Sequence, residues 1–530
     1  MTMYYKIGID VGGTNTDAVL VSKDNKILAK TKQSTTLDVS SGIENALKEV
    51  ISTVNIPMDL IKYIMLGTTH CTNALVERKA LNRIGAIRIG LPASKAVPTM
   101  VDYPNDLRML LGKHLHMVHG GYEFDGRLIS PLDVDEIKDK LNSMKGEIDS
   151  LAITGIFSKT LPDQEKQVAA WAQEIYGDKV KISCSYEIGG LGLLERENAC
   201  ILNAALQGVA TKMVQAFQES VKRINLNSQL FIGQNDGTLL SLEQVQDFPV
   251  LTISSGPTNS IRGAGFLSKV DNGIVIDVGG TTSDGGVLVN HFPRESTRSA
   301  QIGGVLTNFR MPDVVSVGIG GGTIVRFTDK ECTIGPDSVG YLLKEKAIAF
   351  GGNELTLSDF FIAEEQLEIK GAIKSDLLKE SLSELINLPF SQVIHLVRTA
   401  IKNHIENLVD KLKTDAEDIP VIACGGGAFL LPKEIAGASK VIFPDHLEVA
   451  NAFGACIAQF SSEEEMVINT AEFDEKDEME KLLAKVESKL LKNGVTKESI
   501  IILLKESMPL AYLPGVFKLK VKMCGDLVTD

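Results

Sequence analysis

Short apolar runs alternate along the chain with longer segments in which apolar residues recur at helical spacing. Residues 7–21 contain two such runs on either side of a Gly-Gly pair, which predicts a β-hairpin. Residues 63–66 and 420–423 predict buried strands, whereas residues 40–54 and 391–413 predict helices. Strands that alternate with helices indicate an α/β architecture with mixed sheets.

The last part of the chain has a different pattern. Residues 461–494 are rich in charge and carry one apolar stripe, which predicts a helix that stops at Gly494. The charged run at 461–480 is interpreted as a solvated face. Apolar residues and lysines alternate over 517–523, which predicts a half-buried strand whose lysines guard the edge of a sheet.

The hairpin sequence occurs twice. Residues 7–17 read IGIDVGGTNTD and residues 274–284 read IVIDVGGTTSD, and eight of the eleven positions are identical. The two copies are 267 residues apart, a period too long for a solenoid, so we expect two similar domains. The predicted units are an N-terminal domain over 1–190 with the first hairpin, a second domain over 191–464 with the second hairpin, and a small α/β C-terminal appendage over 465–530.

Composition narrows the class of protein. The chain has 530 residues, 44% of them hydrophobic, so two to four domains with full cores are expected. Glycine is abundant at 47 residues and aromatic residues make up only 5%, which suits an α/β enzyme with many tight turns. The net charge of −14 disfavours a nucleic-acid partner, since such proteins normally carry a basic surplus.

Seven cysteines are scattered along the chain without a CxxC pair. This odd, dispersed set argues against a disulfide framework and against a structural zinc site, and makes a cytoplasmic location the expectation. The N-terminus runs directly into a predicted strand, and no apolar run reaches transmembrane length. No membrane partner is therefore expected.

The duplicated hairpin carries the chemistry. Glycine has no Cβ, so backbone N–H groups in these turns can approach a phosphate closely. Asp10 and Asp277 end the two strands, where a carboxylate can orient water on a Mg²⁺ that bridges phosphates. Neither copy fits GxxxxGK[ST], nor GxGxxG opening a helix, which disfavours P-loop and dinucleotide sites. The predicted phosphate-binding positions are Gly12, Gly13, Thr14, Asn15, Gly279, Gly280, Thr281 and Thr282.

Two later segments complete a nucleotide site. The turn Gly425-Gly426-Gly427 follows a predicted strand and offers a flat backbone surface for an adenine ring. Residues 451–458 read NAFGACIA, and their small side chains allow two helices to pack closely, as a hinge between domains requires.

This order of two phosphate hairpins, a glycine-rich adenosine turn and a small-residue helix resembles the actin/sugar-kinase/Hsp70 ATPase superfamily, with its duplicated ribonuclease H-like domains. Five further motifs resemble one branch of it, the hydantoinase/oxoprolinase family, and together with the hairpins they span residues 5–460. They are GTTHCTNALVER at 67–78, SGP at 255–257, VGIGGGT at 317–323, GPDSVG at 335–340 and GGNELTLSD at 351–359. The chain is similar to the family's A-type, ATP-binding subunit.

The resemblance implies an ATP-dependent hydrolase, an amidohydrolase that opens a hydantoin, 5-oxoproline or lactam ring with Mg²⁺ and a B-type partner subunit. In that mechanism ATP phosphorylates the amide oxygen, and water attacks the carbon that has become electrophilic. Thr68, Thr69 and Asn73 would supply hydrogen bonds to the ring. Family members often have a His before GTT and before the IGxGGG motif. Here Leu66 stands at the first position and residues 313–316 contain no His, so the chain resembles a short, divergent branch.

Other functions stay open. The same site would serve a ketone-carboxylase-type subunit that phosphorylates an enolate or bicarbonate, or a sugar or acyl kinase. An ATP-gated activator or an actin-like assembly module belongs to a different class, and the GTT block argues against both because it matches a substrate-side element. A homo-oligomer is also left open.

Three groups of chemically attractive residues are discounted. His114, His116 and His119 form HxHxxH without a specified fourth ligand, so a metal site is disfavoured. Cys71 is interpreted as packing rather than as a nucleophile paired with His70. Residues 195–198 are interpreted as an ordinary charged first turn of a helix.

Overall fold

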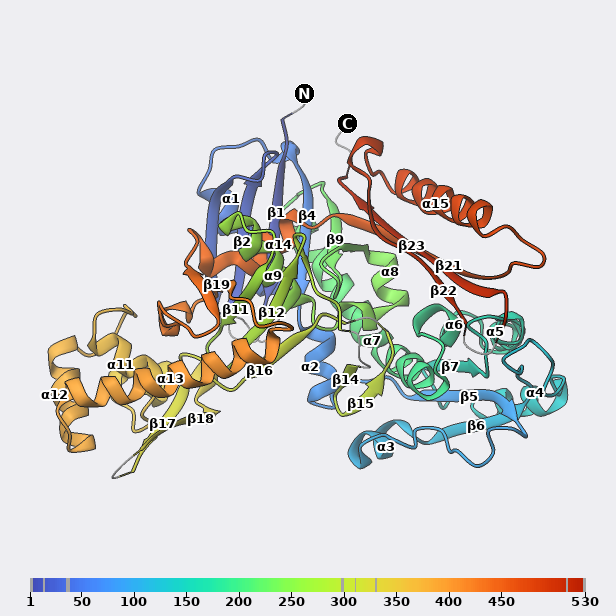
Figure 1. Ribbon diagram of the computed structural model, residues 1–530, viewed down its shortest axis with the longest axis horizontal. Helices are drawn as coiled ribbons and strands as arrows, with labels where there is room; N and C mark the ends of the chain where they lie inside the picture. Colours follow the sequence, from blue (N-terminus) through green and yellow to red (C-terminus); the bar gives the residue numbers. More distant parts are fainter. Residues whose placement is uncertain are drawn as a thin grey trace.

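The computed structural model describes residues 3–12, 15–34, 39–296, 300–309, 311–328, 331–510 and 513–527 (Figure 1). Two predicted phosphate-binding residues, Gly13 and Thr14, lie outside these ranges. The described part of the chain contains no helix that is both long and apolar enough to cross a membrane.

The first large sheet is built around strand β1 (Tyr5–Val11). Its register pairs β1 antiparallel with β2 (Asn15–Ser22) and parallel with β4 (Ile61–Thr68). In the described residues the strand order is β22-β23-β21-β10-β9-β4-β1-β2-β3. The remaining strands are β3 (Ile27–Ser34), β9 (Gln229–Gly233), β10 (Leu239–Ser241), β21 (Phe460–Asn469), β22 (Ile501–Pro509) and β23 (Val516–Gly525).

The second sheet repeats the plan of the first. Strand β11 (Gly273–Val278) pairs antiparallel with β12 (Ser283–Val289) and parallel with β19 (Ile419–Cys424). In both hairpins the first aspartate faces the second across the ladder, Asp10 opposite Asp17 and Asp277 opposite Asp284. The sheet is completed by β13 (Phe292–Pro293), β16 (Val314–Val317) and β20 (Ala438–Ile442). The predicted duplicated α/β architecture with mixed sheets is confirmed.

Helices cover both sheets and supply the cores. The first sheet packs against α1 (Val39–Ser52) and α7 (Leu193–Arg223), whose buried residues join those of β1 and β4 in one apolar cluster. The second packs against α13 (Phe390–Leu412), as the helical pattern over 391–413 predicts. Shorter helices are α2 (His70–Val76), α8 (Leu242–Asp247), α10 (Leu343–Lys346), α11 (Leu357–Ala363) and α12 (Ser375–Ile386). Two small hairpins lie in the second half, β14 (Ala300–Ile302) with β15 (Val305–Thr307) and β17 (Thr323–Phe327) with β18 (Cys332–Ser338).

Two helices cross between the halves. They are α9 (Ser255–Ser268) and α14 (Ala450–Ile457), the small-residue segment predicted to pack closely. A Cβ on Gly454 would lie only 1.9 Å from the Asn259 carbonyl oxygen, and one on Gly263 would lie 1.9 Å from that of Ala450. The two backbones therefore touch, and only glycine at these positions permits the crossing.

A four-stranded parallel sheet is inserted between β4 and α7. Its order is β6-β5-β7-β8, and Figure 1 shows it beside the start of α7. The first turn of α7 is not an ordinary solvated one, because Glu197 is buried and accepts two hydrogen bonds from the buried guanidinium of Arg88. The inserted elements are β5 (Ile84–Leu91), α3 (Asn105–Leu111), β6 (His114–His119), α4 (Val134–Ser143), β7 (Ser150–Gly155), α5 (Asp163–Tyr176), β8 (Lys181–Cys184) and α6 (Ser185–Ile188).

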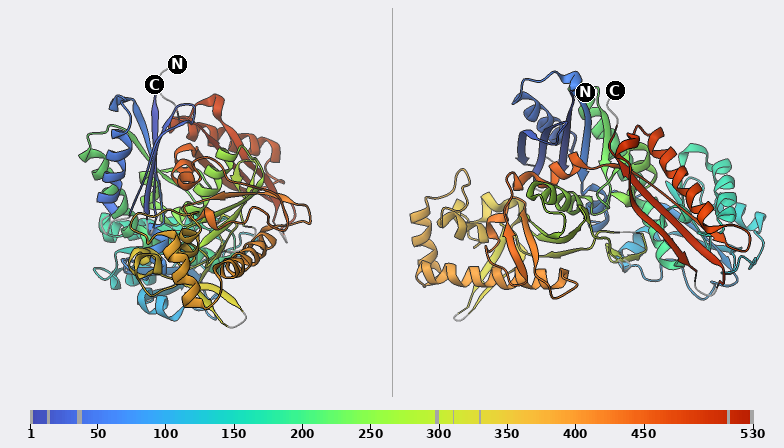
Figure 2. Two further views of the ribbon diagram at one scale, coloured as in Figure 1. Left: turned by 90° about the vertical axis from the view of Figure 1, so that its left-hand side faces the viewer. Right: turned by 45° about the horizontal axis from the view of Figure 1, so that its top comes forward.

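The C-terminal strands extend the first sheet, at the opposite end of the molecule from α11–α13 (Figure 2). Helix α15 (Glu475–Lys492) covers one face of the extension, and Leu519 and Val521 of β23 pack beneath it. The expectation that the β23 lysines guard an edge is wrong, because β23 lies between β21 and β22. The alternation of apolar and charged residues at successive positions predicts a half-buried strand, but it does not distinguish an edge strand from an interior one.

Candidate active site

The two hairpin turns line one cavity of about 340 Å³. The first contributes Asp10, Gly12 and Asn15, and the second contributes Asp277, Gly279 and Gly280. The adenosine-type turn Gly425-Gly426-Gly427 lies on the same cavity. Segments far apart in the sequence thus converge, as a nucleotide site between two domains requires.

Asp10 lies at the centre of an acidic group. The Nδ2 of Asn451 donates a hydrogen bond to Asp10 Oδ2 at 2.8 Å, and the Lys32 ammonium bonds Asp17 Oδ2 at 2.7 Å. Within the described part of the chain, the Oδ1 atoms of Asp10 and Asp17 have no hydrogen-bond partner. Burial raises the pKa of Asp10 to about 8, and repulsion from Asp17 and Asp277 adds to the rise.

The second hairpin holds its aspartates through serine hydroxyl groups. Ser260 Oγ, on α9, donates to Asp277 Oδ2 at 2.5 Å, and Ser316 Oγ on β16 donates to Asp284. Burial raises the pKa of both carboxyls, that of Asp284 to about 6. The two halves therefore share a backbone plan but differ in polar partners.

A glycine lies against the first aspartate in each half. A Cβ on Gly67, at the end of β4, would be 2.7 Å from Asp10 Oδ1. A Cβ on Gly425, just after β19, would be 2.2 Å from Asp277 Oδ1, and Gly425 also has a φ of +85°. Both parallel neighbours of the phosphate hairpins must therefore end in glycine for the carboxylates to keep their positions.

The far end of the cavity is apolar. Leu343, Leu367, Ile369 and Phe429 line it together with the Gly425–Gly427 turn. None of these four belongs to a motif named above, and the sequence analysis missed them. It also missed Asp17 and Lys32, although Asp17 and Asp284 are identical positions of the repeat and that identity was a usable signal.

The glycine block at 320–322 braces the second turn. Gly321 N–H donates to the Gly279 carbonyl at 3.1 Å, and Gly322 N–H donates to that of Gly280 at 2.7 Å. Thr281 and Thr282 belong to the same turn, where the Thr282 carbonyl accepts from Gly279 N–H, but neither side chain lines the cavity.

The predicted substrate-side residues lie one strand away from Asp10. Thr68 is buried at the end of β4, where its Oγ1 accepts from the His70 N–H and its carbonyl accepts from Ser255 Oγ. Asn73 Nδ2 donates to Thr69 Oγ1 at 3.2 Å. None of Thr68, Thr69 and Asn73 lines the cavity in this conformation.

The discounted cysteine and histidines lie outside this site. Cys71 is buried and burial raises the pKa of its thiol to about 11, which suits packing. His119 Nδ1 lies 3.1 Å from Glu136 and His114 Nε2 lies 3.8 Å from Glu147, so each of these histidines has one carboxylate nearby. No group of three or more His, Cys, Asp or Glu side chains with metal-site geometry occurs in the described ranges.

The residues present suit Mg²⁺ and a triphosphate. Mg²⁺ keeps several waters and takes few protein ligands, so the two buried carboxylate oxygens of Asp10 and Asp17 without partners fit water-mediated contact. A cation there would offset the repulsion within the acidic group. Glycine turns without side chains leave room for phosphate on both walls.

Fold and cleft define a protein with the actin-like ATPase architecture. Residues 6–176 match the family described as hydantoinase/oxoprolinase N-terminal region, and residues 196–464 match the family described as hydantoinase/oxoprolinase. The chain belongs to the hydantoinase/oxoprolinase family.

Individual relatives agree with this placement. The caprolactamase subunit alpha of Pseudomonas jessenii is 24% identical over 502 residues, which cover 86% of this chain and 70% of that protein. The crystal structure of the ATP-dependent caprolactamase from Pseudomonas jessenii matches 99% of this chain and 88% of that chain, with a TM-score of 0.80 and 18% identity. Nucleotide-free acetone carboxylase matches 100% of this chain and 88% of that chain, with a TM-score of 0.72 and 18% identity.

Proposed function

We propose that the chain is the ATP-binding subunit of an enzyme that opens a cyclic amide such as a hydantoin, oxoproline or lactam. The observation that carries the proposal is one cavity lined from both sides by the duplicated hairpin turns, with Asp10, Asp17 and Asp277 among its lining residues. Family membership and the similarity to a caprolactamase subunit support the amide substrate.

Bound ATP supplies the phosphoryl group that activates the amide oxygen, and Mg²⁺ neutralises charge on the phosphates. Asp10 and Asp277 orient the water around the cation, while the glycine turns admit the phosphates. The apolar wall at Leu343 and Ile369 and the Gly425–Gly427 turn hold the base. Net ring opening consumes one water at the amide and a second with ATP, giving ADP, phosphate and the ring-opened acid, which is an amino acid for oxoproline or a lactam and an N-carbamoyl amino acid for a hydantoin.

Thr68, Thr69 and Asn73 are proposed to bind the ring. Their support is position, since the register places Thr68 opposite Val11 at the end of β1. Because these side chains do not line the cavity, the halves must move together at the α9–α14 crossing before the ring reaches the phosphate. A B-type subunit is the proposed partner, because the similar caprolactamase protein is itself named as a subunit.

A second candidate is a carboxylase-type subunit that phosphorylates an enolate or bicarbonate. The similarity to acetone carboxylase favours it, since both reactions need only a different acceptor at the same cleft.

The test is ATP turnover by the purified chain with the protein encoded beside it, against a panel of hydantoins, 5-oxoproline, lactams and bicarbonate. We expect a cyclic amide to stimulate turnover and to be consumed with equal release of ADP. Stimulation by bicarbonate and a ketone alone would favour the carboxylase. No stimulation by any amide, with the partner present, would refute the proposal.

A further inference from the structure

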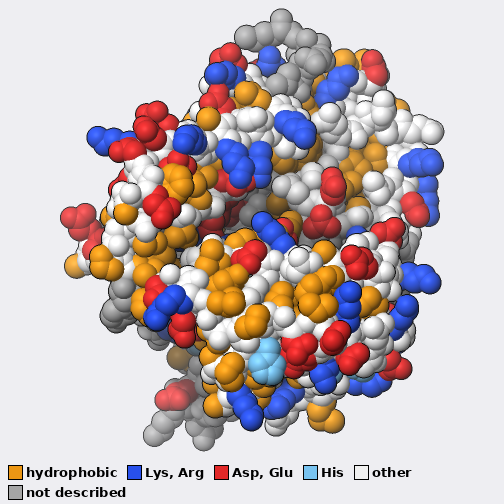
Figure 3. Space-filling view, turned by 90° about the vertical axis from the view of Figure 1, so that its right-hand side faces the viewer, with side chains coloured by type: hydrophobic (Ala, Val, Ile, Leu, Met, Phe, Trp, Pro, Cys, Tyr) orange, Lys and Arg blue, Asp and Glu red, His pale blue; other side chains and the backbone are white. Residues whose placement is uncertain are grey.

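A second cavity, of about 390 Å³, lies between the C-terminal strands and the inserted region of residues 84–190. The face of the molecule that carries it is hollowed, and side chains of both charges gather around the hollow (Figure 3). Its walls come from separate segments, at Lys159, at 187–190, at 234–236, at 244–251 and on strands β21 and β23. The proposed chemistry at the glycine turns does not use it.

One wall is a row of buried lysines on β23. The side chains of Lys518, Lys520 and Lys522 are 12%, 8% and 7% exposed. Lysine is rarely buried unless paired, because removing its charge from water is costly. Each is paired, Lys518 with Glu465 at 2.7 Å, Lys520 with Glu463 and Lys522 with Asp236. So much buried charge around a cavity is typical of a ligand site.

The inserted region adds a fourth lysine to this wall. The Nζ of Lys159 lies 2.6 Å from Glu465 Oε1 and donates to the Tyr186 carbonyl at 2.7 Å. Lys159 and Lys518, from two different regions of the chain, therefore share the carboxylate of Glu465. Burial, then repulsion from Lys518 and Lys520, lowers the pKa of Lys159 to about 7, so an additional anion at this place would be attracted.

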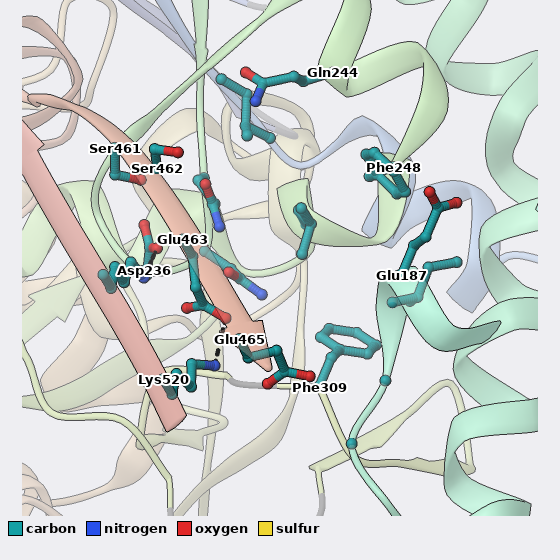
Figure 4. Close-up of a pocket in the computed structure, with 18 of the residues that line it drawn as sticks. Glu187, Asp236, Gln244, Phe248, Phe309, Ser461, Ser462, Glu463, Glu465 and Lys520 are labelled. Atoms are coloured by element: carbon teal, nitrogen blue, oxygen red, sulfur yellow. Dashed lines mark hydrogen bonds and ion pairs between the residues drawn. The ribbon is translucent and has the colours of Figure 1, made fainter. Parts of the chain in front are cut away.

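The other wall is apolar and ends in a carboxylate. Figure 4 shows Phe248 and Glu187 across the cavity from Glu463, and Phe309 beside Glu465. Glu187 Oε1 accepts from the Tyr186 hydroxyl at 3.2 Å, and burial raises the pKa of the Glu187 carboxyl. A cation opposite the lysines would lower the cost of that buried charge.

The second cavity lies at the carboxyl end of strand β9, which is two strands away from β1 of the nucleotide cleft. Strand β9 runs parallel to β4, which runs parallel to β1, and the cavity starts at Gln234, directly after β9. Ligands of open α/β sheets bind outside the carboxyl ends of such strands. Two strand spacings separate β9 from β1, roughly 10 Å.

We propose that this second cavity binds a small zwitterion, an amino acid whose carboxylate lies at Lys159 and Lys518, whose ammonium group faces Glu187, and whose apolar chain lies along Phe248 and Phe309. Hydrolysis of a lactam yields such a molecule, so its identification as the product rests on the proposed function. A free amino acid acting as an effector has the same chemistry.

The test is calorimetric titration of the full chain with 6-aminohexanoate, hexanoate and hexylamine. We expect the zwitterion to bind at least tenfold more tightly than either singly charged probe. Lys159→Met and Glu187→Gln each weaken its binding at least tenfold, and Lys159→Arg, which keeps the charge, restores it to within threefold. The matched control is Lys485→Met, because Lys485 pairs with Glu464 on the opposite face of β21. A fluorescent ATP analogue, bound equally by all variants, reports that each is folded.

Equal binding of hexanoate and 6-aminohexanoate, or unchanged affinity in both Lys159→Met and Glu187→Gln, would overturn the inference. Failure of the proposed function has a different signature. If 6-aminohexanoate binds as expected but no cyclic amide stimulates ATP turnover, the cavity is an effector site and the amide proposal fails. If caprolactam stimulates turnover but no amino acid binds, only the second cavity is wrongly assigned.

Discussion

The two cavities are built in opposite ways. Glycines in short turns line much of the nucleotide cleft, and in each of the two hairpins an aspartate lies two residues before the first glycine. The second cavity is lined by long charged side chains and by apolar side chains from segments between residues 159 and 522. A backbone-lined site leaves a contiguous motif in the sequence. A side-chain-lined site leaves no motif, since its members meet only after the sheets have formed.

The largest expected effect separates the cavities outright. Asp10→Ala removes a carboxylate that we propose to orient water on the cation, so we expect ATP turnover to fall by roughly a thousandfold, as when a charge-stabilising group is lost. Binding of 6-aminohexanoate stays unchanged. Steady-state kinetics and calorimetry on one preparation measure both quantities. Asp24→Ala, at an exposed turn, is the control and keeps full turnover. Near-normal turnover in Asp10→Ala would remove the assignment of the cleft.

A backbone-lined cleft is sensitive to a single methyl group. Gly425→Ala forces a Cβ against Asp277 at a positive φ, and strain of about 1–3 kcal/mol is expected. We expect nucleotide affinity to fall by roughly ten- to a hundredfold, the equivalent of that strain. At Gly426 the nearest atom to a new Cβ is Lys32 Cε at 3.7 Å, so Gly426→Ala loses much less. Equal losses in the two variants would contradict the steric explanation.

Ligand binding at the second cavity is expected to depend on pH through Lys159. The charged groups that face the Lys159 ammonium are Glu187, Glu463, Glu465, Lys518, Lys520 and Arg196. Burial and the neighbouring lysines hold its pKa at about 7, so it is charged below that pH and neutral above it. Affinity for 6-aminohexanoate should fall roughly tenfold as pH rises from 6 to 8. Calorimetry at four pH values measures this. Lys159→Arg should abolish the dependence, and a dependence that persists in Lys159→Arg argues against this residue.

The smallest expected effects concern ligand contacts. Phe248→Ala removes apolar surface at the second cavity, and a loss of about 1 kcal/mol, or roughly fivefold in affinity for 6-aminohexanoate, is expected.

At the nucleotide cleft, Thr68→Ala should weaken stimulation by the cyclic amide more than it weakens ATP binding. Competition titrations and turnover assays resolve both. Equal losses in stimulation and ATP binding would count against Thr68 as a substrate residue.

Sequence reasoning reached the fold and the glycine turns that meet at the cleft because these depend on local order. The repeated Asp-Gly-Gly hairpin, the turn at Gly425 and the small residues at 451–458 are all contiguous. Leu343 and Ile369 of the apolar wall were missed, since their convergence depends on how helices pack. Glu197 was read as a surface charge because its partner, Arg88, lies 109 residues away.

The alternation of lysine and apolar residues along β23 also determines the register in which this strand joins the sheet. A shift of the register by one residue would turn Lys518, Lys520 and Lys522 toward the apolar face of α15. It would also place Leu519 and Val521 beside the carboxylates. Each of these changes would raise the free energy of the folded chain, so the shifted register is less stable than the observed one. The alternation of lysine with apolar residues therefore fixes the register in which β23 pairs with β21 and β22.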